Sequence, residues 1–175
     1  MNRFLKLLKV FFCVCLCLVS IQLFAQHEVH VENDSHAFHK SHIALFGGAT
    51  SNFSHNSTHL SAGLDYEYRW NKSFGTGLIV EYVNVEGGEF IGGFPLFVHV
   101  GKGFKITLSP IFINKEHHPE ETTHHGEAER ITTFAFRTGV GYTFHLGTIS
   151  LEPALFFDAG ESNALVYGLT LGKGF

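Results

Sequence analysis

The last eleven residues of the chain alternate between two kinds of side chain. One set is large and apolar and the other is small: the first comprises Leu165, Tyr167, Leu169 and Leu171, and the second Val166, Gly168, Thr170, Gly172 and Gly174. Because successive side chains of a β-strand point to opposite faces, this pattern predicts a strand with one face in an apolar medium. The strand stops on an aromatic residue, Phe175. A backbone that crosses lipid must pair its polar groups internally, and apart from helices only a closed barrel of strands does so.

A period of two recurs through the rest of the chain. It is clearest over residues 59–70, where polar residues alternate with the apolar set Leu60, Ala62, Leu64, Tyr66, Tyr68 and Trp70. After residue 26, no window offers about 18 consecutive apolar residues or a sustained helical period of about 3.6. The alternation predicts eight strands, near residues 41–50, 59–70, 73–84, 89–101, 103–114, 131–145, 149–158 and 164–175. The sequence therefore predicts an all-β fold.

The connections between these strands are of two kinds. Residues 70–73, 101–103 and 146–148 are short and contain Gly or Asn, which is typical of hairpin turns. The others are mostly longer and more polar, near residues 51–57, 85–88, 115–130 and 159–163. This alternation predicts an antiparallel up-and-down barrel with turns at one rim and loops at the other. With an even number of strands, both ends of the barrel segment lie at the rim of the turns.

Residues 1–26 have the pattern of a cleavable signal peptide. A basic start with Arg3, Lys6 and Lys9 precedes an apolar run, and a small residue, Ala25, offers a cleavage position. The alternative is a retained membrane helix, but Ser20 and Gln22 interrupt the apolar run and no stop-transfer charges follow. All three cysteines lie in this segment, so we expect no disulfide in the mature chain. Residues 27–40 then form a His-rich segment before the barrel at 41–175.

The polarity of the two faces separates two kinds of eight-stranded barrel. A soluble barrel of lipocalin type has an apolar cavity and a polar exterior. Here the face opposite the large apolar residues is charged, with Asp65, Glu67, Arg69, Glu81, Lys105, Arg137, Glu152 and Asp158. Aromatic residues such as Phe104 and Phe112 also stand at both ends of the apolar face, as in the girdles of membrane barrels. We therefore expect a transmembrane barrel with its charges inside.

On these grounds, the chain resembles the small eight-stranded outer-membrane barrels of OmpA and OmpX type, also described as porin-family proteins. The resemblance covers about residues 41–175 and depends on the strand pattern, the terminal Phe175 and the export signal. It implies a location in the outer membrane of a Gram-negative bacterium, periplasmic termini, lipid as the surrounding partner and a monomer. It also implies that the barrel-assembly machinery recognises the last strand through Tyr167, Leu169, Leu171 and Phe175.

The inward charges predict a filled lumen rather than an open pore. Eight strands leave an interior only wide enough for side chains, so the charged groups must pair to offset their burial. His99 and His145 fall on the same face and add to the basic set. Some barrels of this size modify lipid A with a Ser, a His and an acid, and the only local hint of this is His55-Asn56-Ser57. We expect no enzymatic activity. The formal net charge of −4 and the lack of a basic stripe also exclude nucleic acid as a partner.

The 13 histidines are the unusual feature of the composition. Three groups stand out among them: His27 and His30; His36, His39 and His42 at a spacing of three residues; and His117, His118, His124 and His125 in the longest predicted loop, which is also rich in Glu. The candidate metal ligands are His36, His39 and the four loop histidines. Imidazoles and carboxylates suit Zn²⁺, Ni²⁺ or Cu²⁺, so a divalent transition metal is the one cofactor that the composition suggests. The alternative is that these are solvated polar segments. The predicted function is a structural or surface role, with metal binding or sensing and lipid modification as alternatives.

Overall fold

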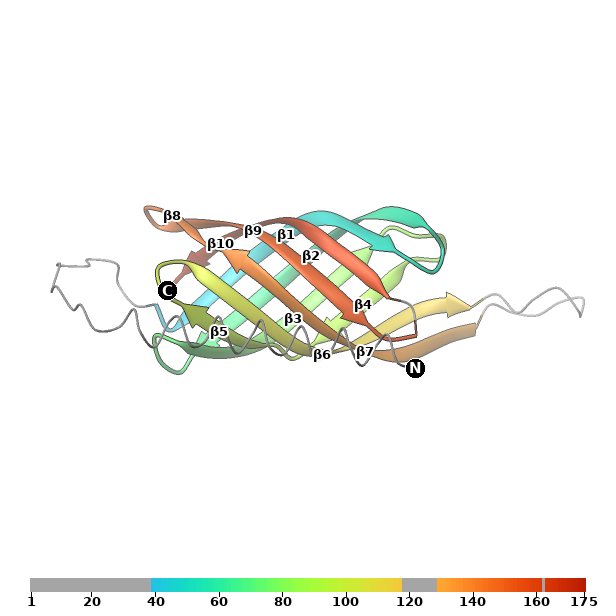
Figure 1. The fold of residues 1–175 in the computed structure, drawn as a ribbon, viewed down its shortest axis with the longest axis horizontal. Coiled ribbons are helices and arrows are strands. Elements are labelled where there is room, and N and C mark those ends of the chain that lie inside the picture. Colours follow the sequence, from blue (N-terminus) through green and yellow to red (C-terminus); the bar gives the residue numbers. More distant parts are fainter. Residues whose placement is uncertain (1–38, 118–128, 162) are drawn as a thin grey trace, which may run out of the picture. The chain divides into compact units, whose positions relative to one another are not determined.

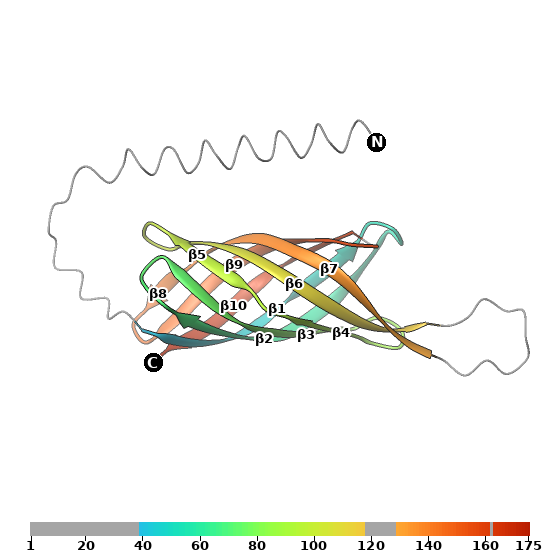
Figure 2. The ribbon, with the colours of Figure 1, turned by 90° about the horizontal axis from the view of Figure 1, so that it is seen from below.

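The computed structural model describes residues 39–117, 129–161 and 163–175, which form a β-barrel. Figure 1 shows the strands as a tilted set, and Figure 2 shows the same strands after a quarter turn. They are β1 (Ser41–Asn52), β2 (Ser57–Arg69), β3 (Phe74–Val83), β4 (Glu89–Gly93), β5 (Leu96–Val100), β6 (Phe104–His117), β7 (Glu129–Tyr142), β8 (Phe144–Leu146), β9 (Ile149–Ala159) and β10 (Ala164–Gly174).

These ten segments make up eight barrel strands. β4 and β5 are separated only by Phe94 and Pro95, and both pair with β3 on one side and with β6 on the other in one continuous register. Proline has no backbone N–H for the ladder, which explains the interruption. β7 and β8 likewise pair with β9 in one register across Thr143, whose N–H donates to the Gly103 carbonyl at 2.8 Å instead. The predicted eight-stranded antiparallel barrel is confirmed.

The barrel closes between the first and last strands. β1 pairs with β10 along its whole length except Ser41, whose N–H donates to the Phe175 carbonyl at 3.1 Å. Cross-strand partners followed once around the barrel from Ser41 return to β1 at Ser51, ten residues further along. This offset requires tilted strands, and barrels of this kind tilt by about 35–45°. Figures 1 and 2 show the oblique course of the strands.

The two faces of each strand differ as the period of two predicts. Large apolar side chains on the outward face are exposed, including Leu45, Leu60, Leu64, Val80, Phe112, Val140, Leu155 and Leu169. Outward aromatic rings pack across strands near both rims, with Phe104 on Tyr142 at 5.2 Å between centroids and Phe112 on Phe134 at 5.6 Å. A continuous apolar outer surface of this extent requires an apolar surrounding or a partner.

Several strand ends differ from the sequence-based expectation, most of all around the connection at 115–130. The predicted connection at 115–130 is shorter than expected, because β6 extends to His117 and β7 begins at Glu129. Polar contacts hold this extension together: the Asn114 amide donates to Thr132 at 3.0 Å, and Arg130 donates to Asn114 at 3.1 Å. Cross-strand polar pairs of this kind leave no apolar alternation in the sequence, so the pattern did not reveal them. Among the described residues, no helix is long and apolar enough to cross a membrane.

Candidate functional site in the barrel lumen

The lumen has two ends. The turn end carries the connections 70–73, 101–103 and 147–148, and the loop end carries the connections 53–56, 84–88 and 160–163. All eight charged residues predicted to face inward lie on the lumen side of their strands, and six of them are buried. The strands that carry them are β2, β3, β6, β7 and β9. The alternation of side chains along each strand determines which residues point inward. The register between strands determines which of these residues are in contact.

Arg137 is the centre of the largest ion cluster. Its Nε and one terminal nitrogen donate to the two carboxylate oxygens of Asp158, at 2.7 and 2.8 Å, and the other terminal nitrogen donates to Glu81 at 2.6 Å. The guanidinium carbon also lies 5.5 Å from the centre of the Phe156 ring. All three charged side chains are at most 4% exposed. A planar guanidinium suits this role, because its fork of donors matches two carboxylates at once.

A second ion pair joins Lys105 of β6 to Glu152 of β9. The Lys105 ammonium lies 2.7 Å from Glu152 Oε1, and the Thr143 hydroxyl donates to Glu152 Oε2 at 2.8 Å. Both carboxylate oxygens therefore have a partner. The ammonium also lies 5.1 Å from the centre of the Phe97 ring. Buried pairs persist only when further hydrogen bonds satisfy the remaining atoms, as they do here.

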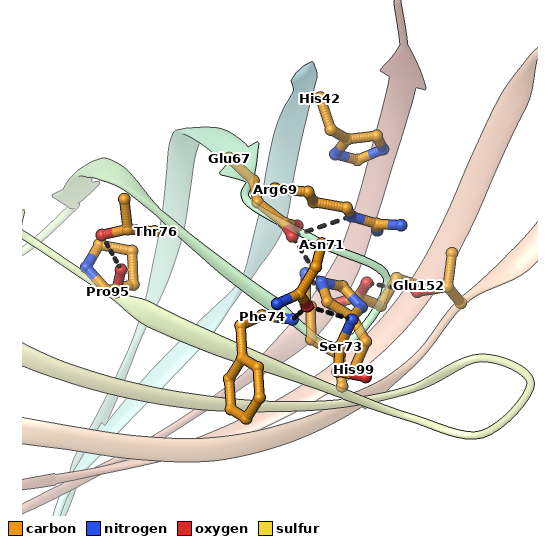
Figure 3. A network of polar contacts seen from close by, with 12 residues as sticks. His42, Glu67, Arg69, Asn71, Ser73, Phe74, Thr76, Pro95, His99 and Glu152 are labelled. Carbon is orange, nitrogen blue, oxygen red and sulfur yellow. Dashed lines mark hydrogen bonds and ion pairs between the residues drawn. The ribbon is translucent and has the colours of Figure 1, made fainter. Parts of the chain in front are cut away.

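A third cluster surrounds Glu67 at the turn end and is drawn in Figure 3. Glu67 Oε1 lies 2.5 Å from His99 Nε2 and 3.0 Å from Arg69 Nε. Arg69 is the more exposed partner, with 20% of its side chain accessible. His42 lies nearby and its Nε2 is 2.8 Å from the Ser150 hydroxyl. The sequence grouped His42 with His36 and His39 and did not place it in the lumen, because the alternation is weak near the start of the first strand.

Asp65 is the one member of the predicted set for which the described residues provide no direct ion pair or hydrogen bond. It lines a small central cavity together with Lys105, Arg137 and Glu81. The cavity measures about 10 Å³, which is room for about one water molecule. Side chains therefore fill the middle of the lumen almost completely.

Two lumen glycines provide space for carboxylates. Sequence reasoning did not identify these glycines. A Cβ at Gly75 would lie 2.7 Å from Glu67 Oε1, and a Cβ at Gly141 would lie 2.6 Å from Glu152 Oε1. In the sequence these glycines look like ordinary small residues of the inward face. Their signal is visible only with the register, which places each one beside the strand that carries the acid.

The loop end of the lumen has a different character. An apolar cluster of Ile79, Val83, Ile91, Ile111 and Ala135 fills the interior here, with Val85 and Ile113 packed against it. Above it lies a cavity of about 500 Å³, which Asp158 also lines. Since Arg137 and Glu81 line the small central cavity, the Arg137 cluster separates the two spaces.

The predicted metal ligands mostly lie outside the described residues. His36, His118, His124 and His125 fall there, and the side chain of His117 is not described either. His39 is described and exposed. Within the described ranges, no group of three or more His, Cys, Asp or Glu residues is arranged to hold a metal ion. Metal binding therefore stays a prediction. His55 and Ser57, the residues with a hint of hydrolase chemistry, line the outer cavity.

The predicted assembly residues all lie on the outward face. Tyr167, Leu169 and Leu171 are exposed along β10, and Phe175 follows directly after it. The Phe175 N–H donates to the Ser41 carbonyl at 2.9 Å, so the terminal residue also belongs to the seam that closes the barrel.

No family model matches this chain, and no curated protein matches it. Among solved structures, it is similar to the N-terminal β-barrel domain of Pseudomonas aeruginosa OprF, with 12% sequence identity and a TM-score of 0.55, over 78% of this chain and 98% of that chain. It is also similar to the outer membrane protein Ail of Yersinia pestis in a phospholipid bilayer nanodisc, with 12% identity and a TM-score of 0.50, over 79% of this chain and 100% of that chain. This chain therefore has the fold of the small, closed, eight-stranded outer-membrane β-barrels.

Proposed function

We propose that this protein is an integral outer-membrane barrel with a structural or surface role, and that its lumen is closed by buried ion pairs. The observation that carries the proposal is the position of Arg137, which bridges Asp158 and Glu81 across the interior. A guanidinium held by two carboxylates fills the cross-section where an open pore would need water. The protein then acts through its outer surface and its loops rather than by conducting solutes.

The location of the protein in a membrane is supported by the outer face. Exposed side chains such as Leu60, Leu64 and Leu169 would aggregate in water, whereas lipid solvates them without cost. The signal peptide at 1–26 is the proposed route of export. The segment 27–40 and both ends of the barrel then lie in the periplasm, the loops face outward and the barrel is a monomer. The proposal includes no catalytic step.

The closed lumen is tested by recording from purified barrel in planar lipid bilayers. We expect no stable porin-sized conductance step, because the central cavity has room for about one water molecule. The folded protein should also migrate faster than the boiled protein on SDS gels, because a closed barrel resists SDS until heated. Large, reproducible steps from protein that shows this mobility shift would contradict the closed lumen.

The location and the assembly signal are tested by deleting Phe175. The deletion removes an aromatic residue from the outward face and two seam hydrogen bonds to Ser41. We expect less folded barrel in the outer-membrane fraction and more in the periplasm. Lys173→Gln is the matched control, because it alters an exposed residue of the same strand and keeps the terminus. Normal yield after the deletion, or recovery of native protein in soluble form, would contradict this part of the proposal.

A further inference from the structure

The cavity at the loop end has the size and the floor of a ligand site. Its volume of about 500 Å³ falls in the range of about 300–1,000 Å³ that is usual for small-molecule sites. Val83, Ile91 and Ile113 form part of its lining, and all three belong to or pack against the apolar cluster below. An apolar group that enters the cavity would therefore contact a surface that is already packed and does not need to rearrange.

The charges around this floor are mainly negative. Four carboxylates, those of Glu86, Glu89, Glu116 and Glu161, line the cavity together with one ammonium, that of Lys115. A fifth carboxylate, Asp158, already accepts two hydrogen bonds from Arg137. The polar lining also includes the imidazoles of His55 and His59 and the neutral side chains of Thr50, Asn52, Ser57 and Thr133.

The nearest other cation, Arg130, stands opposite Glu116 in the ladder of β6 and β7. The excess of negative charge is therefore counted without Glu116, from Glu86, Glu89 and Glu161 against Lys115. The Arg130 guanidinium donates to Asn114 at 3.1 Å and to the Gly87 carbonyl at 3.2 Å, and it lies 5.9 Å from the centre of the Phe90 ring. Asn114 and Phe90 point to the outer side of the barrel, so the contacts hold Arg130 there. The cavity keeps an excess of negative charge.

A buried hydroxyl, that of Ser61, lies next to lining residues of the cavity but is not itself part of the lining. Ser61 is 6% exposed, and its Oγ has no hydrogen-bond partner among the described residues. It follows His59 on the inward face of β2, and its cross-strand partner is Val83; both of these residues line the cavity.

We propose that the outer cavity binds a small organic cation with an apolar body, such as a cycloalkylammonium. The apolar body lies on Val83, Ile91 and Ile113, and the ammonium lies among Glu86, Glu89 and Glu161. This site rests on the proposed function, because it is a closed-end cup only while the Arg137 cluster blocks the lumen beneath it. If the protein acts at the cell surface, the class of ligand that it binds there is then a small organic cation.

A matched pair of probes tests whether the cavity prefers a cation to an anion. 1-Aminoadamantane and adamantane-1-carboxylate share a rigid apolar body and differ in charge. Each is titrated into isotope-labelled full-length mature protein in zwitterionic nanodiscs, and backbone amide shifts are followed by NMR. We expect saturable shifts at cavity residues with the amine and none with the carboxylate. Equal effects of the two probes, or shifts confined to outward residues of the apolar belt, would overturn the proposal.

Substitutions then locate the amine. Glu86→Gln, Glu89→Gln and Glu161→Gln together should weaken its binding by about 10- to 100-fold, since each partly exposed charge contributes about 2- to 5-fold. Lys115→Gln should tighten binding by about 2-fold, because it removes the one cation in the lining. Its matched control is Lys102→Gln, the same substitution in a turn at the other end of the barrel, which should change nothing. Unchanged affinity in the triple variant would overturn the proposal.

Two further readouts separate this inference from the closed lumen. Heat-modifiable mobility shows that each variant still forms a barrel, so a loss of binding is not a loss of fold. Bilayer conductance reports on the lumen independently of the amide shifts. A barrel that shows no conductance and binds no amine contradicts only the proposed binding site. A barrel that conducts contradicts the closed lumen.

Discussion

The two ends of the lumen are filled by different kinds of side chain. From the turn end to the middle, the interior is filled by ions, in the clusters around Glu67, Lys105 and Arg137. At the loop end it is filled by aliphatic side chains, among which Ile111 is completely buried. The ionic part fills the cross-section through a few directional contacts, while the aliphatic part leaves a cavity above it.

The ion clusters and the aliphatic cluster differ in how their stability responds when one side chain is removed. A buried charge that loses its partner is costly, whereas a whole buried network replaced by neutral groups is often tolerated. An aliphatic cluster has no partners in this sense, and its loss of stability follows the volume removed. We therefore expect the loss of one ionic partner to be rescued by neutralising the others, and the loss of an aliphatic side chain to scale with the volume removed.

The largest effect is expected for Arg137→Met. The substitution leaves Glu81 and Asp158 buried without their cation, and this should lower the free energy of unfolding by about 3–5 kcal/mol. Urea unfolding in lipid vesicles measures the change. Adding Glu81→Gln and Asp158→Asn should restore much of the stability, because no charge is then left unpaired. If the single variant is as stable as the native barrel, the cluster does not hold the lumen together.

A somewhat smaller loss is expected for Ile111→Ala in the aliphatic part. Removing a fully buried side chain there should cost about 2–4 kcal/mol, from lost burial and the cavity left behind. Unlike the first case, no second substitution of a neighbour to a polar residue should rescue it. Ile113→Ala, which alters a partly buried neighbour, should cost less in the same unfolding assay. Equal losses at the two positions would mean that burial does not distinguish them.

Two adjacent glycines of β1 test the assignment of the inward and outward faces, because Gly48 lies on the inward face and Gly47 on the outward face. A Cβ at Gly48 would lie 2.2 Å from the Tyr167 carbonyl oxygen and 2.7 Å from the Phe46 ring, whereas a Cβ at Gly47 would meet nothing within 4 Å. Gly48→Ala should therefore destabilise the barrel by about 1–3 kcal/mol, as overpacking does. Gly47→Ala should be neutral or slightly stabilising. The pair is compared by the temperature at which the gel mobility shift is lost, and the reverse order would contradict the assigned faces.

The smallest effect is expected at the turn end, with Arg69→Gln. Arg69 is the most accessible cation of the three lumen clusters, and Glu67 keeps His99 as a second partner. The loss should stay below about 1 kcal/mol and shrink further in high salt, because solvent and ions screen an accessible pair. A loss as large as that of Arg137→Met would show that the turn end is as tightly sealed as the middle.

The sequence predicted the fold because period two is a local property. Alternation along each segment assigned Asp65, Arg137 and Glu152 to the inward face and Leu60 to the outward face, without knowledge of any partner strand. The boundaries were less accurate where the pattern faded. The run at 89–101 proved to be β4 and β5 on either side of Phe94 and Pro95, and the polar pair of Asn114 and Thr132 extended β6 and β7 beyond the expected strand ends.

The contacts of the site followed from the closure of the barrel. In the sequence, Glu81, Arg137 and Asp158 were three charges on inward faces, and any acid was a plausible partner for any base. The stagger between strands brings residues 56 positions apart into contact, as for Glu81 and Arg137. Nothing in the local pattern of either strand encodes that stagger.

The sequence by itself thus determined the eight strands, the two faces and the sign of the charge inside, because side-chain direction in a strand depends only on position along it. Only the tertiary structure decided that Arg137 bridges two acids, that Asp65 lines a small cavity without a direct pair among the described residues, and that an acidic cavity lies at the loop end. These features depend on how far each strand is shifted against the next, which is fixed only when β1 and β10 close the barrel.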